Sequence, residues 1–228
     1  AKVERGTSSK TNGVSAAAGN VNLESVNLRQ DTISYVQGMY GSFDTYKASV
    51  VYNMGLKKGF GLHLKATTSH TDGYRCNSWN NSHAFTAKFG YYFNDRHSID
   101  VLSINGYHSN CQGWIGSTKA ELDNDVRANG NTKEETDNWI QTVNKIQYNG
   151  WLTDNTLLSA SVYLQYQTGS YRFDHYNYVY HAKLAQPYEG HPDGDWAVHQ
   201  DAIFDYGLTH YLYGGNVVAR STIGIVDV

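Results

Sequence analysis

Apolar and polar residues alternate one by one through long segments of the chain after about residue 31. The alternation is strict in 60–68 (FGLHLKATT), 85–93 (FTAKFGYYF) and 157–166 (LLSASVYLQY). Alternation over roughly 8 to 10 residues predicts strands of a sheet with one apolar and one polar face. No segment of comparable length has an apolar stripe of helical period. The pattern therefore predicts an all-β, antiparallel fold.

Turn signals between these segments predict about nine strands. The expected strands are 31–41, 45–53, 60–69, 84–93, 98–108, 139–150, 156–168, 203–213 and 216–226. Tight turns are expected at NMGLKKG (53–59), FNDRHS (93–98), LTDN (152–155) and YGGN (213–216).

Longer links separate the same strands at 69–83, 108–137 and about 169–202, so that short and long connections alternate along the chain. The first connection on the long-link side, YGSFDTY (40–46), is the exception because it is brief. An outer-membrane barrel has short turns at one end and long loops at the other, whereas a soluble sandwich has no reason for this asymmetry.

Aromatic residues gather at the ends of the expected strands, as they do in the girdles of a membrane barrel. The set is Tyr52, Phe60, Tyr91, Tyr92, Phe93, Tyr107, Tyr148, Trp151, Tyr166 and Tyr171. Tyr-rich strands also occur in soluble carbohydrate-binding sandwiches, which remain an alternative. A closed bacterial barrel has an even number of strands, and nine is odd, so we expect this chain to hold part of a barrel. It begins with Ala1 and has no signal peptide, which fits a processed chain or a fragment.

Composition narrows the choice of function. The 228 residues include 19 Tyr, 7 Phe and 5 Trp but only 2 Pro and 2 Cys, and aromatic residues favour strands. No run of about 18 apolar residues could span a bilayer as a helix. A net charge of -3 gives no reason to expect a nucleic-acid partner, which would select a basic surface.

The opening stretch, ERGTSSKTNGVSAAAGNVNLES (4–25), is small and polar. It resembles the end of the plug domain of TonB-dependent outer-membrane receptors, where an Arg-Gly pair and a Gly-rich run precede a short strand. The matching positions are Arg5, Gly6, Gly13, Gly19 and Asn22. Ala16–Ala18 stands where glycine is common in the family. A flexible linker is the alternative on composition alone.

Later segments resemble the same family in the same order. They are YGSFDTYKASVVYN (40–53), TTSHTDGYRCNS (67–78), the hairpin from Phe89 to Ser117 with QGWIG (112–116), and 135–171. The resemblance covers about residues 3–173. It implies two domains: residues 1–28 as the C-terminal end of the plug, and 29–228 as the N-terminal part of a transmembrane barrel of about 22 strands.

The resemblance also implies a function. Receptors of this family lie in the outer membrane of Gram-negative bacteria, in contact with its lipid, and import a scarce nutrient. An iron-siderophore or haem is the leading expectation here, with cobalamin or a glycan next. Import is energised by a TonB-type complex that acts through an N-terminal segment which these residues do not include.

No catalytic pattern stands out, so we expect no enzyme, no cofactor and no metal site. The ten histidines form no recognisable ligand set. HPDGDW (191–196) lacks the spacing of an EF-hand calcium loop and reads as a polar turn. The acidic residues of 123–137 read as a solvated loop.

Loop aromatics and cations are the best candidates for contact with a ligand, because rings offer broad apolar contact and Arg pairs with oxyanions. The candidates are Tyr74, Arg75, Trp79, Trp114, His108 and Trp196. Cys76 and Cys111 fall in neighbouring loops and could form a disulfide in an oxidising compartment; two unrelated thiols are the alternative. For the whole chain, the alternatives to a transporter are a non-transporting outer-membrane adhesin or binding barrel and a secreted carbohydrate-binding module.

Overall fold

The computed structural model of the chain describes residues 2–5, 19–22, 26–30, 32–111, 113, 115–174 and 203–222. The elements are β1 (Lys2–Arg5), β2 (Gly19–Asn22), β3 (Tyr35–Gly41), β4 (Thr45–Lys57), β5 (Phe60–Thr71), β6 (Asn80–Tyr92), β7 (His97–Cys111), α1 (Lys119–Asn124), β8 (Thr136–Trp151), β9 (Thr156–Asp174) and β10 (Ile203–Ser221). Within these residues, no helix is long and apolar enough to cross a membrane.

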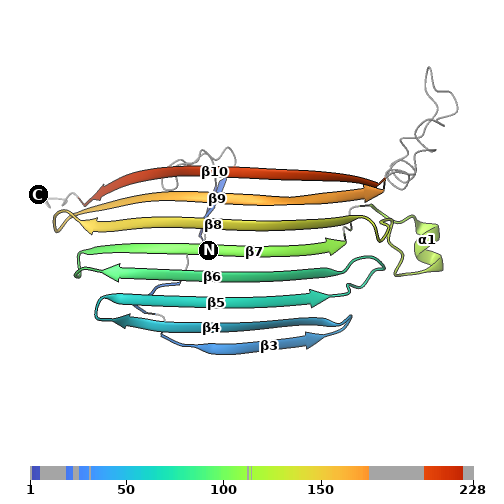
Figure 1. Cartoon of the computed structure of the whole chain (residues 1–228), viewed down its shortest axis with the longest axis horizontal. Helices are drawn as coiled ribbons and strands as arrows, with labels where there is room; N and C mark the ends of the chain where they lie inside the picture. Colours follow the sequence, from blue (N-terminus) through green and yellow to red (C-terminus); the bar gives the residue numbers. More distant parts are fainter. Residues whose placement is uncertain are drawn as a thin grey trace, which may run out of the picture.

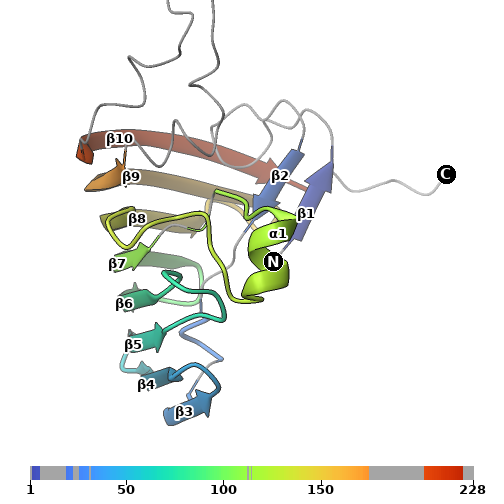
Figure 2. The same cartoon turned by 90° about the vertical axis from the view of Figure 1, so that its right-hand side faces the viewer.

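Eight of the strands, β3 to β10, form one antiparallel sheet in which each strand pairs with its neighbour in the sequence. Figure 1 shows them side by side along the longest axis of the molecule. β1 and β2 pair with each other in a separate two-stranded sheet. Figure 2 shows this short sheet on one side of the twisted large sheet. The all-β, antiparallel prediction is confirmed.

The connections at the two ends of the large sheet differ in length. One end has the turns at 58–59, 93–96 and 152–155. The other end has the turn at 42–44, the loop 72–79 and the loop 112–135 with α1, and we call it the long-loop end (Figure 1). Short and long connections therefore alternate over the described hairpins, as the sequence predicted.

The predicted strand count was wrong at the C-terminal end. The sequence predicted strands 203–213 and 216–226 with a turn at YGGN, but 203–221 is one continuous strand, β10. It pairs with β9 without interruption from Ile203 to Ser221. The large sheet thus has eight described strands, and the expected count of nine is corrected.

The glycine pair of YGGN has a packing role in place of a turn. Gly214 lies opposite Tyr163 of β9, and a Cβ atom at Gly214 would lie 2.6 Å from the Tyr163 hydroxyl oxygen. Glycine in a strand interior commonly marks such a close approach. Gly214 therefore makes room for a neighbouring ring, a role that a turn prediction from sequence cannot distinguish.

The register assigns every side chain of the large sheet to one of two faces, because directly paired residues lie on the same face. One row runs through Leu64, Ala87, Ser103, Asn144, Leu164 and Tyr213. The next row runs through Leu62, Phe89, Val101, Ile146, Val162 and Gly215. We call the face that carries these rows the apolar face. The opposite face carries Lys65, Lys88, Lys145, Gln147 and Ser161, and we call it the polar face.

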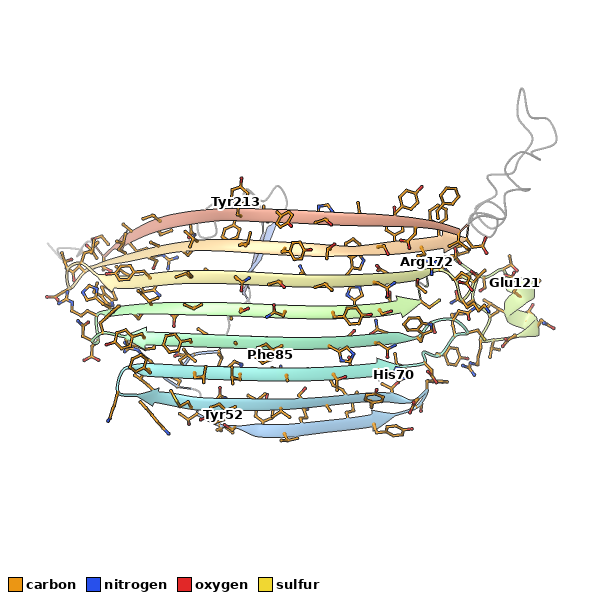
Figure 3. The ribbon with its side chains drawn as sticks, viewed as in Figure 1. Tyr52, His70, Phe85, Glu121, Arg172 and Tyr213 are labelled. Carbon is orange, nitrogen blue, oxygen red and sulfur yellow. The ribbon has the colours of Figure 1, made fainter. Side chains whose placement is uncertain are left out.

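Large apolar side chains of the apolar face are exposed. The set includes Val36, Val50, Tyr52, Phe85, Phe89, Val101, Ile146, Val162, Leu164, Tyr211, Tyr213 and Val217; Figure 3 labels Tyr52, Phe85 and Tyr213 among them. Between the levels of Ile99 and Tyr107, strands β5 to β10 carry no Lys, Arg, Asp or Glu on this face, whereas Lys57 of β4 lies at the level of Ile99. Eight residue steps at about 3.4 Å each make this uncharged band about 27 Å long, measured along the strands.

Four polar residues of β7 and β8 interrupt the band near its middle: Ser103, Asn105, Thr142 and Asn144. Thr142 Oγ1 donates to Asn105 Oδ1 at 3.1 Å, and Asn105 Nδ2 donates to Ser103 Oγ at 3.1 Å. Three of the four side chains thus form hydrogen bonds with one another, which lowers the free-energy cost of placing polar groups on an apolar surface.

Replacing Gly214 with Val should destabilise the β9–β10 pair, because the added side chain would collide with the ring of Tyr163. We expect a loss of about 1–3 kcal/mol in the free energy of unfolding, measured by urea titration of the purified protein. Gly207→Val is the matched control on the same strand, since a Cβ atom there meets nothing within 4 Å. Equal stability of the two variants would contradict the role assigned to Gly214.

Candidate functional site

The loops of the long-loop end form one hydrogen-bonded cluster. Arg127 Nε donates to Tyr74 O at 2.7 Å, and Cys76 N donates to Arg127 O at 2.9 Å. Arg75 Nη1 donates to Ala128 O at 2.7 Å. These bonds join the loop 72–79 to the loop 112–135 across about fifty residues of sequence.

Asparagine side chains complete the junction. Asn129 Nδ2 donates to Cys76 O at 2.7 Å and to Asn77 O at 2.9 Å. Asn77 Nδ2 donates to Asn131 O at 3.1 Å, and Asn131 Oδ1 accepts from Ile115 N at 2.8 Å. Asn131 is buried. Amide side chains satisfy backbone groups that irregular loops would otherwise leave without partners.

Helix α1 begins at a capping box that its sequence encodes. Thr118 N donates to Glu121 Oε2 at 2.6 Å, and Glu121 N donates to Thr118 Oγ1 at 3.3 Å. The Thr-x-x-Glu spacing is a known start signal for a helix. Figure 3 labels Glu121 in this helix, beyond the ends of the strands.

A partly open hollow of about 540 Å³ lies between the two loops. Its lining includes Tyr74, Arg75, Ser78, Ile115, Leu122 and Asn129. The hollow combines an aromatic ring, aliphatic side chains and hydrogen-bonding groups. This is the usual make-up of a small-molecule site.

Two of the predicted ligand contacts, Tyr74 and Arg75, meet at this hollow. The Tyr74 ring packs edge-on against Phe43 with the centroids 5.5 Å apart. Trp79 is the last residue of the loop 72–79, directly before β6, and its carbonyl accepts from Cys111 N at 2.9 Å. His108 lies on the polar face, with Nε2 3.8 Å from Asp137 Oδ2. Neither of them lines the hollow.

Trp114 and Trp196, the other two candidates, lie outside the described residues. The sequence interpretation missed Ile115, Leu122 and Asn129, which line the hollow from the second loop. The length of the link 108–137 was the signal that this loop could fold over its neighbour.

The predicted disulfide between Cys76 and Cys111 is not formed. Cys76 is exposed, whereas Cys111 is buried. Cys111 Sγ donates to the carbonyl oxygens of Thr132 at 3.3 Å and Glu135 at 3.2 Å. The thiol of Cys111 therefore points into its own loop, and the alternative of two unrelated thiols is correct.

The segment that follows β2 crosses the polar face near the short-turn end. Leu28 is 1% exposed. It packs where Gly61 and Gly90 leave room, since Cβ atoms there would lie 2.9 and 2.7 Å from Leu28 atoms. Lys88 Nζ donates to the carbonyl oxygen of Val26 at 2.8 Å.

Arg29 extends the contact, with its guanidinium 4.5 Å from the centre of the Tyr92 ring. The segment 26–30 is thus fixed to the polar face by apolar, hydrogen-bonding and cation–π contacts. The trace of this segment lies on the same side of the large sheet as β1 and β2 (Figure 2).

The residues of the predicted plug motif are partly described. Arg5 pairs with Gly19, and Lys2 pairs with Asn22, in the antiparallel pair β1–β2. Gly6 and Gly13 lie outside the described residues. The sequence predicted one strand in 1–25, whereas the structure has two.

The middle of the polar face carries three lysines and one aspartate, Asp100, and so has a net positive charge. Lys88 and Lys145 lie in one row on either side of Leu102, and Lys65 lies in the adjacent row. A polar hollow of about 360 Å³ on the same face has a lining that includes Lys145, Gln147, Asn149, Ser161, Asn216 and Arg220. This surface suits an anionic solute or the polar backbone of another chain segment.

Comparisons with solved structures identify the architecture. The open form of the ferric-catecholate import receptor Fiu from E. coli K12 matches 99% of this chain and 36% of its own, with a TM-score of 0.71 and 14% identity. The closed form matches 74% of this chain and 26% of its own, with a TM-score of 0.63 and 16% identity. The fold of this chain is therefore similar to part of the β-barrel fold of these two receptor structures.

This chain spans about a third of the length of the Fiu structures. No protein-family model matches it, and no curated protein matches its sequence. The relationship to Fiu is therefore one of fold.

Replacing Leu28 with Ala should loosen the segment 26–30, because the smaller side chain leaves a gap above Gly61 and Gly90. We expect a loss of about 2–4 kcal/mol in the local opening free energy, measured by hydrogen exchange of the amides of 26–30. Ile33→Ala is the control, since Ile33 is 74% exposed. Unchanged protection in Leu28→Ala would show that the segment is held without this contact.

Proposed function

We propose that this chain is part of a TonB-dependent transport receptor in the outer membrane of a Gram-negative bacterium. In this proposal residues 1–28 form the C-terminal end of the plug, and 29–228 form the N-terminal part of the barrel. The observation that carries the proposal is the division of the sheet into an exposed apolar face and a polar face that binds the segment 26–30.

The apolar face fits a lipid environment. Soluble proteins rarely expose a continuous apolar surface of this extent. Its uncharged band is about 27 Å long along the strands, which at the strand tilt of about 35–45° found in outer-membrane barrels gives a height of about 20 Å, comparable to their apolar band of about 25 Å. Tyr91 and Tyr148 lie near one edge of the band and Tyr107 near the other, where aromatic girdles are expected.

The polar face would then line the interior of the barrel. Two features support this assignment: the lysines of its middle rows, and the contacts of Val26, Leu28 and Arg29 with β5 and β6. A plug has to pack against a polar wall, and the described contacts are of that kind. The position of β1 and β2 on the same side agrees with it (Figure 2).

An iron chelate is the cargo we propose first. The similar fold of a ferric-catecholate import receptor supports it. The hollow beside Tyr74 and Arg75 offers a ring and polar groups at the long-loop end. The lysines of the polar face suit an anionic complex on its way inward. Haem, cobalamin and a glycan are the other ligands to be tested.

Import in this proposal requires energy from a TonB-type inner-membrane complex, which would act through a segment N-terminal to β1. No bond of the cargo is made or broken. A binding barrel that does not transport would bind the ligand equally well but would not move it. Uptake therefore has to be measured as well as binding.

Replacing Leu164 with Lys should destabilise the protein in lipid vesicles. Leu164 lies on the apolar face and is 44% exposed. A lysine near the middle of a lipid-facing band costs about 2–4 kcal/mol, which urea unfolding in vesicles measures. The adjacent Gln165→Lys places the same charge on the polar face, where we expect a change within about 0.5 kcal/mol. A stable Leu164→Lys protein that stays monomeric in plain buffer would favour a secreted module.

A panel of ferric catecholate, ferric hydroxamate, haem and cobalamin tests the cargo by direct binding to the purified protein in detergent. We expect ferric catecholate to bind, with affinity about tenfold weaker in Tyr74→Ala because one aromatic contact is lost. Tyr213→Ala is the control, because this tyrosine is 79% exposed on the apolar face. Binding without uptake of labelled iron by cells would favour the non-transporting barrel.

A further inference from the structure

Three side chains with metal-binding atoms meet at the long-loop end: Asp44, His70 and Asp72. His70 Nε2 lies 3.3 Å from Asp72 Oδ1 and 3.8 Å from Asp44 Oδ2. One donor atom from each residue lies within 4.8 Å of the other two. Figure 3 labels His70 near the end of β5, close to the loops.

The turn between β3 and β4 brings Asp44 to this position. Phe43 and Asp44 both have positive φ, at 59° and 48°, and Thr45 N donates to Ser42 O at 3.2 Å. Two central residues with positive φ define the tight hairpin turn that Asn-Gly usually forms. A Phe-Asp pair in such a turn is unusual and requires support from its surroundings.

The surroundings supply that support and bring the second carboxylate. Asp72 N donates to Phe43 O at 2.8 Å, which joins the turn to the end of β5. Tyr40 OH donates to Asp44 Oδ1 at 3.1 Å, which orients that carboxylate with Oδ2 toward His70. The two carboxylates therefore converge on one histidine from two different loops.

The other ring nitrogen of His70 has a fixed partner. Nδ1 lies 2.5 Å from Asn81 Oδ1, and an amide oxygen only accepts, so Nδ1 carries the proton. In the neutral ring Nε2 then has its lone pair toward the two carboxylates. A histidine that donates from one nitrogen and faces carboxylates with the other is the usual arrangement at a metal ion.

We propose that Asp44, His70 and Asp72 bind a divalent transition metal of the zinc type at the long-loop end of β3, β4 and β5. Zinc bonds of about 2.0–2.2 Å in tetrahedral geometry place neighbouring donor atoms roughly 3.4 Å apart. The distances of 3.3 and 3.8 Å from Nε2 are close to this value.

The charge and the solvent exposure of the three proposed ligands also suit a zinc ion. The two carboxylates would neutralise the ion, and the nitrogen ligand favours zinc over calcium or magnesium. His70 is 19% exposed, and the side chains of Asp44 and Asp72 are 55% and 62% exposed. The exposed carboxylates can thus move to close around the ion, and a fourth position stays open to water.

The site does not rest on the proposed transport function. His70 belongs to the apolar-face rows, beyond the level of Tyr107, whereas the polar face would carry the cargo. The expected role of the ion is to fix the turn 42–44 to the start of the loop 72–79.

Zinc titration of the detergent-purified protein tests the proposal, with isothermal calorimetry for affinity and elemental analysis after dialysis for stoichiometry. We expect one zinc ion per chain. Asp44→Asn and Asp72→Asn should each weaken binding by at least about tenfold. Both residues are exposed, so these variants keep the fold. His70→Gln should have a similar effect.

His108→Gln is the matched control, because His108 faces a single carboxylate, that of Asp137, at 3.8 Å. Its zinc affinity should equal that of the unmodified protein. Absence of zinc binding would overturn the proposal and leave Asp44, His70 and Asp72 as a polar cluster without a metal ion. Zinc binding that survives Asp72→Asn and His70→Gln would also overturn it, since the ion would then lie elsewhere.

Discussion

The backbone hydrogen-bond ladder of the large sheet is the constraint from which its other properties follow. Each of the eight strands pairs with its sequence neighbour in a fixed register. Because side chains alternate along a strand, this register decides which face each residue occupies, and a slip of one residue would exchange the faces. Leu164 and Gln165 show the result: neighbours in sequence, they lie on the apolar and the polar face.

The same ladder satisfies the backbone polar groups on both the apolar and the polar face of the sheet. Backbone N–H and C=O groups that pair within the sheet need no other partner, so the apolar face can carry mainly apolar side chains. At several glycines of the sheet, a neighbouring side chain approaches the backbone closely. Gly61 and Gly90 admit Leu28 on the polar face, and Gly214 admits the ring of Tyr163. These close approaches fix where other segments can rest on the sheet.

Much of this fold could be predicted from sequence because the period of two is a local signal. The strands β5, β6 and β9 and the alternation of short and long connections were all evident from the pattern. Contacts between distant segments were not. The YGGN sequence has the composition of a turn, and only the ring of Tyr163 across the ladder explains its place inside β10.

The same limit applied to the candidate sites. Tyr74 and Arg75 could be singled out as loop residues, but their partners Arg127 and Ala128 lie 53 residues away. The thiol of Cys111 was assigned a partner in another loop, whereas its own loop supplies the acceptors. Asp44 gave no signal, because its approach to His70 depends on a Phe-Asp turn that propensities disfavour.

The loop 72–79 connects the two candidate sites of the long-loop end. Asp72 begins the loop and faces His70, while Tyr74 and Arg75 line the hollow two and three residues later. The turn residue Phe43 contacts both parts, since its carbonyl accepts from Asp72 N and its ring packs on Tyr74. Arg127 lies over the same ring, 5.6 Å from its centre. Any group that fixes Asp44 to Asp72 therefore also restricts Tyr74, so occupancy of one site would change the order of the other.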